Sequence, residues 1–405
     1  MRALIVFDKF KDALTASEAC GLACKALSQA KSDWTLDPAP LTDGGEGFSE
    51  ILTLAEAGVM ESAIVKGPRG ESVQAKFGWV PLSKIPQAAW QLLDLPELSS
   101  MDDKRIAVVE MASASGLALL PEAMRDPWQT TSFGTGQLLR AAADAGACAI
   151  VLGVGGSATN DLGLGALAAL GIRFSSTTEE SLSSILQPGL EQIDHSSLPP
   201  VPAVWERIDQ IVGAVLPALP PIRIACDVAN PLLGSRGCTA VYGPQKGLRP
   251  ADFERMERAV SAMAARLCNH FGREASFMQF PGNGAAGGIP FGLGCATPTR
   301  LMPGIDFVSA WLDLDARIAR ADIVITGEGS FDASSLDGKG PGAIASRALQ
   351  LGKKVHVFAG KVSAPPRPGL ELHAITPPGM PLPEALASAP RLLGETLRRA
   401  FTAGS

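Results

Sequence analysis

One short segment combines glycines, hydroxyl groups and a carboxylate at a spacing that suits phosphate chemistry. It reads GVGGSATND over residues 153–161, between an apolar run at 149–152 and a small-residue stretch at 162–170. Glycine-rich backbone lets N–H groups converge on phosphate oxygens, and the positive end of a following helix dipole adds attraction. The carboxylate of Asp161 does not bind phosphate, but it can hold the Mg²⁺ that does. The segment predicts a protein that handles phosphorylated small molecules.

Carboxylates also stand in other loops of the chain. Asp43, Asp227 and Glu328 lie in glycine-rich loops or just beyond an apolar run, where ligands bind in open α/β sheets. Lys11 lies in the loop after the apolar run at 3–7, and Lys339 lies a few residues beyond the loop of Glu328. Phosphoryl transfer requires acids for Mg²⁺, an acid for the attacking hydroxyl, and lysines or N–H groups for the developing charge. An alternative stays open at each position, because such an Asp often stabilises its own turn and a loop Lys is often solvated.

Other chemistries find little support in the sequence. No GxxxxGK[ST] segment occurs, which excludes a P-loop kinase. The segment at 282–287 matches GxGxxG, but Pro281 precedes it and Pro290 follows closely. We therefore expect a tight turn or close backbone packing there instead of a dinucleotide site. The four histidines are scattered and none neighbours a glycine loop, which is poor material for a metal–histidine or Ser-His-Asp site.

Composition sets further bounds. The chain has 405 residues, 46% of them hydrophobic, with 43 Gly and 31 Pro, which suits an α/β protein with glycine loops. Aromatic residues make up 5% and the net charge is −6, so we expect no nucleic-acid partner. Seven dispersed cysteines without a CxxC pair predict reduced thiols. We find neither a signal peptide nor an apolar run of about 18 residues, so we expect a cytoplasmic protein without a membrane partner.

Alternating strands and helices predict a doubly wound α/β fold at both ends of the chain. Apolar runs at 3–7, 321–326 and 354–359 read as parallel strands, and Thr15 with Glu18 forms a capping box that starts a helix. In the middle, residues 73–80 alternate with period two, as in an antiparallel strand.

From this pattern we expect two domains. Residues 1–66 and 298–405 would form a discontinuous Rossmann-like domain, and residues 67–297 an inserted α/β domain. Further strands are expected at 105–110, 149–152 and 222–226, and surface insertions at 81–103 and 175–221.

Several motifs together resemble the bacterial glycerate kinase family that includes glycerate 2-kinases. They run in order along most of the chain, at 7–14, 42–47, 110–117, 130–136, 155–161, 226–232, 243–247, 284–288 and 325–329. Two segments depart from the family pattern. The usual PDSFK opening reads FDKFK at 7–11, and Ser334 stands where the family has a Gln.

The resemblance implies phosphorylation of D-glycerate by ATP and Mg²⁺, in a cleft between the two domains. The 2-hydroxyl as acceptor rests on the resemblance alone. Charge then suggests roles. Lys11, or amides of the loop at 113–116, would bind the glycerate carboxylate, and Asp43 or Asp227 would orient or deprotonate the hydroxyl. Asp161 and Glu328 would hold Mg²⁺. The phosphates would contact Gly155, Gly156, Ser157, Thr159 and Asn160, with Lys339 over the leaving charge.

Rival functions remain open at this stage. A sensor that only binds a nucleotide or hydroxy acid could use the same loops, although so many acids would repel one another without a metal or proton. A dehydrogenase would need a clearer dinucleotide motif. Phosphorylation of the 3-hydroxyl, or of a related small hydroxy acid, is a further alternative, and a homodimer stays open as the assembly. Coupled ADP release with D-glycerate separates a kinase from the other classes.

Overall fold

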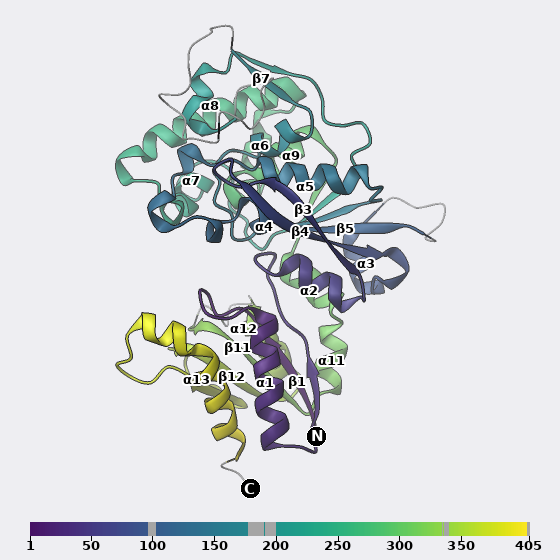
Figure 1. Ribbon diagram of the computed structural model, residues 1–405, viewed down its shortest axis with the longest axis vertical. Coiled ribbons are helices and arrows are strands. Elements are labelled where there is room, and N and C mark those ends of the chain that lie inside the picture. Colours follow the sequence, from purple (N-terminus) through teal and green to yellow (C-terminus); the bar gives the residue numbers. More distant parts are fainter. Residues whose placement is uncertain (96–102, 177–189, 191–199, 334, 336–339, 403–405) are drawn as a thin grey trace. The chain divides into compact units, whose positions relative to one another are not determined.

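The computed structural model describes residues 1–95, 103–176, 190, 200–333, 335 and 340–402. The chain forms two compact units, each described here by itself (Figure 1). Unit 1 consists of Met1–Asp43, Pro86–Ala89 and Ile305–Ser405, and unit 2 of Gly44–Ile85 and Trp90–Gly304.

Unit 1 is built on a parallel five-stranded sheet. Its strands are β1 (Arg2–Phe7), β2 (Thr35–Pro38), β11 (Ile323–Phe331), β12 (Lys354–Val362) and β13 (Leu370–Ala374). They lie in the order β13-β12-β11-β1-β2, and every neighbouring pair is parallel. This is a doubly wound order in which the connections reverse direction between β1 and β11. Ligands in such folds bind beyond the carboxyl ends of the strands at this switch point.

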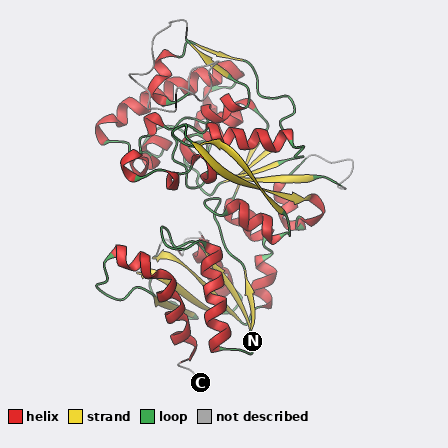
Figure 2. Ribbon diagram, viewed as in Figure 1, coloured by secondary structure: helices red, strands yellow, loops and turns green. Residues whose placement is uncertain are grey.

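The helices of unit 1 cover the sheet (Figure 2). They are α1 (Ala16–Ala30), α10 (Gly304–Trp311), α11 (Leu314–Arg320), α12 (Gly340–Gln350) and α13 (Leu382–Thr402). α1 packs on α13, and their buried faces share one core with β1 side chains such as Ile5 and Phe7. The predicted capping box is confirmed, because the Thr15 side chain accepts from the Glu18 N–H and the Glu18 carboxylate accepts from the Thr15 N–H.

Unit 2 contains a mixed six-stranded sheet in the order β10-β9-β6-β5-β4-β3. Its strands are β3 (Val59–Lys66), β4 (Ser72–Pro81), β5 (Arg105–Glu110), β6 (Ile150–Gly153), β9 (Ile222–Ala225) and β10 (Thr299–Met302). β3–β4 and β4–β5 are antiparallel, which confirms the strand expected from the period-two pattern at 73–80, and the other pairs are parallel. Two short strands, β7 (Arg173–Ser175) and β8 (Gln210–Val212), pair separately.

The helices of unit 2 are short apart from α5 and α8. They are α2 (Phe48–Ala55), α4 (Ala112–Ser115), α5 (Phe133–Asp144), α6 (Leu164–Ala169), α7 (Cys238–Tyr242), α8 (Phe253–Phe271) and α9 (Ile289–Ala296). α3 (Gln87–Leu93) contains residues of both units. Among the helices of the described residues, none has the length and apolar character needed to cross a membrane.

The observed division differs in position from the expected domains at 1–66, 67–297 and 298–405. β3 pairs along its whole length with β4, so residues 59–66 belong with the second unit. β10 pairs with β9 and extends the same sheet. Because β9 and β10 lie far apart in the sequence, local sequence patterns could not show that the boundary expected at 297/298 falls after β10. The expected insertions at 81–103 and 175–221 fall partly outside the described residues.

Candidate functional site

Three carboxylates, those of Asp8, Asp43 and Glu328, lie near one another at the switch point of the unit 1 sheet. Asp8 follows β1 directly, and its main-chain N–H donates to the carbonyl oxygen of Gly327 in β11 at 3.0 Å. Because Phe7 is paired in register with Gly327, Asp8 comes beside Glu328. Asp43 lies on the segment that follows the neighbouring strand β2. The fold therefore brings residues from both ends of the chain to one edge of the sheet.

The electrostatics of this cluster are those of crowded acids. Burial and the nearby charge of Asp43 together raise the pKa of Asp8 from 3.8 to about 7, against the opposing effect of the Lys9 N–H. Burial also raises the pKa of Glu328, with Asp332 and Asp43 adding to it and Ser335 opposing it. Like charges held this close are stabilised by a proton or a cation.

A divalent cation fits these residues. The Oε1 atom of Glu328 is buried and has no hydrogen-bond partner among the described residues, and neither has the buried Oγ1 of Thr42, next to Asp43. Buried acceptor oxygens without a donor cost free energy, and each such case calls for an explanation such as an ion. Carboxylate oxygens are the ligands that Mg²⁺ prefers. Asp43 and Glu328 are thus suited to hold the ion.

Two lysines of unit 1, Lys11 and Lys339, are predicted site residues, and the structure describes only Lys11. Lys11 lies in the loop after β1 with an exposed side chain, and its main-chain nitrogen would be 3.6 Å from a Cβ placed on Gly329. Lys11 therefore lies near the glycine segment that carries Glu328. Lys339 lies outside the described residues. The first residue of α12, Gly340, has φ +47°, and a Cβ there would come 3.5 Å from the Asp8 carboxylate.

The glycine loop of unit 2, residues 153–161, is hydrogen-bonded to two neighbouring segments. The N–H of Gly155 donates to the carbonyl oxygen of Gly44 at 2.9 Å, and the N–H of Ala158 donates to the carbonyl oxygen of Ser115 at 2.9 Å. Among the described residues, the amides of Gly156 and Ser157 have no such acceptor. Gly156 is exposed and has φ +71°, a left-handed conformation that favours glycine. The exposed Gly156 amide is available to an anion, and the Ser157 amide next to it belongs to a buried residue.

The predicted metal ligand Asp161 has another role. Its fully buried carboxylate accepts from the N–H and Oγ–H of Ser132 at 2.7 and 2.8 Å. It also accepts from the N–H groups of Gly163 and Gly165, at 3.1 and 3.2 Å. Burial raises the pKa of Asp161, and these four donors oppose the shift. The anion at the start of α6 is therefore the protein's own carboxylate. A metal ligand at Asp161 does not fit this environment, and the turn-stabilising alternative does.

The other predicted site residues of unit 2 are Thr159, Asn160 and Asp227, and they differ in burial. Thr159 and Asn160 are fully buried, and the Thr159 Oγ1 and Asn160 Oδ1 atoms have no partner among the described residues. The segment behind them is tightly packed, because a Cβ on Gly287 would come 2.0 Å from the Thr159 carbonyl oxygen. The GxGxxG segment therefore serves close backbone packing, as expected. Asp227 is partly buried just beyond β9, at the carboxyl end of that strand.

A fully buried lysine anchors the glycine loop and was not among the predicted site residues. The Lys246 ammonium donates to the Ser157 Oγ at 2.9 Å and to the Thr159 carbonyl oxygen at 2.6 Å. Burial lowers its pKa to about 8, although the nearby thiol of Cys238 and carboxylate of Asp161 raise it. The motif GPQKG at 243–247 carried the only sequence signal for this residue. Asp8 was likewise not assigned a role, because its partner Glu328 comes from the far end of the chain.

The fold and these residues define a doubly wound α/β protein with an acidic ligand site at its switch point. Comparison with known proteins makes the identification more specific. The model of the glycerate kinase family matches residues 3–403. A glycerate kinase of Bacillus subtilis is 34% identical over 403 residues, covering 98% of this chain and 96% of the relative. A glycerate 2-kinase of Escherichia coli K12 is 34% identical, covering 90% and 86%.

The solved structures agree with this match. A crystal structure of a protein assigned as glycerate kinase 2 from Salmonella typhimurium LT2 aligns with a TM-score of 0.72 and 32% identity. It covers 100% of this chain and 96% of that chain. The chain belongs to the glycerate kinase family, and the fold class and resemblance expected from the sequence are confirmed. The named relatives are phosphotransferases with an alcohol acceptor.

Proposed function

We propose that this protein transfers the terminal phosphoryl group of ATP to D-glycerate and forms 2-phosphoglycerate. The family match that extends over residues 3–403 carries the proposal, and the glycerate 2-kinase among the relatives supports the choice of hydroxyl. The acids of unit 1 and the glycine loop of unit 2 are the parts that such a reaction needs.

We assign the ion of this reaction, Mg²⁺, to Asp43 and Glu328. The unpartnered Oε1 of Glu328 and the mutual repulsion of the acids support this assignment. Asp43 and Glu328 would hold the ion, which would supply positive charge to offset the negative charge that develops during phosphoryl transfer. Asp161 is left out of the ligand set, because its carboxylate already accepts four hydrogen bonds within unit 2.

The chain's own residues supply the remaining functions. Asp43 orients the glycerate hydroxyl and takes its proton with the carboxylate oxygen that does not hold the ion, and Lys11 pairs with the glycerate carboxylate. Asp227 remains a second candidate for the base. The amides of Gly156 and Ser157 bind phosphate oxygens, while Lys246 keeps the Ser157 hydroxyl in place. Thr159 and Asn160 support the glycine loop as buried residues. Lys339 remains the proposed cation near the leaving group.

The decisive experiment follows product formation directly. Purified protein is incubated with D-glycerate, ATP and Mg²⁺, and the product is examined by phosphorus NMR together with coupled ADP release. We expect a 2-phosphoglycerate signal. A 3-phosphoglycerate signal would keep the kinase and move the acceptor hydroxyl. No ADP release with any small hydroxy acid would favour a binding protein without catalysis.

A further inference from the structure

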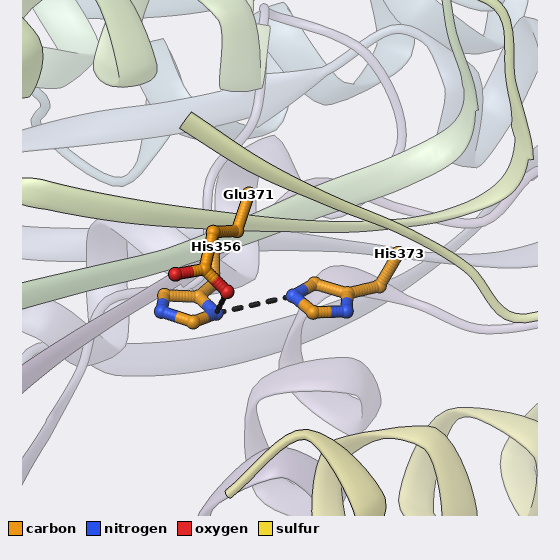
Figure 3. Close-up of side chains that lie close together, drawn as sticks. All are labelled: His356, Glu371 and His373. Carbon is orange, nitrogen blue, oxygen red and sulfur yellow. Dashed lines mark hydrogen bonds and ion pairs between the residues drawn. The ribbon is translucent and has the colours of Figure 1, made fainter. Parts of the chain in front are cut away.

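Three side chains of metal-ligand type gather on one face of β12 and β13 (Figure 3). His356 in β12 is paired in register with Glu371 in β13, and Phe358 is paired with His373. Side chains two residues apart on a strand share a face, as do directly paired residues. His356, Glu371 and His373 therefore project to the same side. They share no residue with the carboxylate cluster at the switch point.

Their separations suit a common ligand. The Nδ1 of His356 lies 3.1 Å from the Nε2 of His373 and 3.6 Å from the Oε2 of Glu371, and all three ligand atoms lie within 4.8 Å of one another. Nitrogens bound to one tetrahedral zinc ion at about 2.0–2.1 Å are about 3.3–3.4 Å apart, slightly more than the 3.1 Å found here. Two histidines and one carboxylate on a facial arrangement are a recurrent set for divalent transition metals.

The surroundings hold the rings and leave an entrance. The two imidazole planes differ by 3°, His373 stacks on Phe358, and His356 contacts Phe401 of α13. His356 is buried, whereas the Glu371 side chain is 62% exposed, so an ion and its water ligands can reach the cluster from that side.

We propose that His356, Glu371 and His373 form a binding site for one divalent transition-metal ion, such as Zn²⁺. Without the ion, one imidazole N–H donates to the other ring. When the ion binds, that proton moves to the second nitrogen of its ring, and both facing nitrogens donate their lone pairs to the metal. The ion lies on the Glu371 side of the two nitrogens, and water completes its coordination. Nitrogen ligands select against Mg²⁺, which prefers oxygen.

The test measures binding of the metal alone. Untagged full-length protein is freed of metal with a chelator and titrated with Zn²⁺ in excess Mg²⁺ by calorimetry, and the absorption of bound Co²⁺ reports nitrogen ligation. We expect one ion per chain. His373→Asn should weaken binding by about a hundredfold, and the exposed Glu371→Gln by about tenfold. His270→Asn, which changes an imidazole outside the cluster, should leave binding unchanged.

Two results would overturn the proposal. One is a wild-type chain that takes up no Zn²⁺, and the other is Glu371→Gln and His373→Asn variants that bind as tightly as wild type. Circular dichroism checks that each variant is folded, and Glu371→Gln keeps the test valid if His373→Asn does not fold. The phosphotransferase assay with Mg²⁺ and ATP should be the same in wild type and Glu371→Gln, so failure of the metal site and failure of the proposed kinase are distinguishable.

Discussion

The N–H of Asp8 donates to the carbonyl oxygen of Gly327, and this 3.0 Å bond joins the end of β1 to the middle of β11. It places the first acid of the chain beside Glu328, which is contributed by the C-terminal part of unit 1. The pKa values of Asp8 and Glu328 are both raised, because burial and neighbouring acids disfavour the charged forms of these carboxyls. Four predictions test the consequences for stability, metal binding and turnover.

Asp8→Asn should stabilise the metal-free protein at neutral and higher pH. The folded chain holds the Asp8 proton up to about pH 7, whereas the unfolded chain releases it near 3.8. Between these values the folded state binds more protons, so stability falls as pH rises, and the full penalty is present above pH 7. Asn carries no charge and keeps the Oδ1 that accepts from Lys9. We expect a gain on the order of 4 kcal/mol above pH 7 that disappears below about pH 4.

Urea unfolding in EDTA between pH 4 and pH 8 measures this difference. The exposed Asp33 provides the matched control, since Asp33→Asn removes a surface charge and should change the free energy of unfolding by no more than about 0.5 kcal/mol. A constant difference between wild type and Asp8→Asn would show that Asp8 is not held protonated by the fold.

Asp43→Asn and Lys11→Ala should each lower turnover by at least about tenfold and leave the fold intact. General-base assistance contributes about 10²–10⁴-fold, and loss of one charge-stabilising donor costs about 10²–10³-fold. Coupled ADP release with D-glycerate measures the rates. Asp12→Asn and Lys25→Ala change exposed residues of unit 1 in the same way and should keep wild-type rates. A near-native rate in either site variant removes that residue from the mechanism.

Glu328→Gln should weaken Mg²⁺ binding by about tenfold or more, because the ion loses one of its charged oxygen ligands. In wild type, Mg²⁺ without nucleotide should raise the thermal midpoint, since a ligand that binds only the folded state stabilises it. Removing Mg²⁺ with EDTA should abolish phosphoryl transfer. The exposed Glu384→Gln of α13 is the control. Equal Mg²⁺-induced shifts in Glu328→Gln and wild type would place the ion elsewhere.

Asp161→Asn should destabilise the protein without changing Mg²⁺ binding. The substitution puts an amide NH₂ where one carboxylate oxygen now accepts hydrogen bonds, so buried N–H and O–H groups of Ser132, Gly163 or Gly165 lose an acceptor. We expect a loss of about 2–4 kcal/mol in the free energy of unfolding. Chemical denaturation measures it, with the exposed Asp144→Asn as control. An unchanged stability together with weaker Mg²⁺ binding would restore Asp161 to the metal site.

Several elements could be predicted because their causes are local. The capping box of Thr15 and Glu18 requires only four consecutive residues, and the alternation at 73–80 identified β4 without knowledge of its partners. The strands expected at 105–110 and 149–152 correspond closely to β5 at 105–110 and β6 at 150–153. Asp161 shows the limit of such reasoning. Its type and neighbours suit a metal ligand or a turn, and the choice depends on Ser132, which contacts it from a distant segment.

The amino-acid sequence by itself determined the α/β class, the family and the glycine loops, because hydrophobic period, small residues and ordered motifs are properties of neighbouring positions. Only the tertiary structure decided which acids meet. The order β13-β12-β11-β1-β2 brings Asp8 to Glu328 and His356 to His373, while burial gives Asp161 and Lys246 their partners. Strand order is set by how the whole chain buries its apolar surface, and no local pattern carries that information.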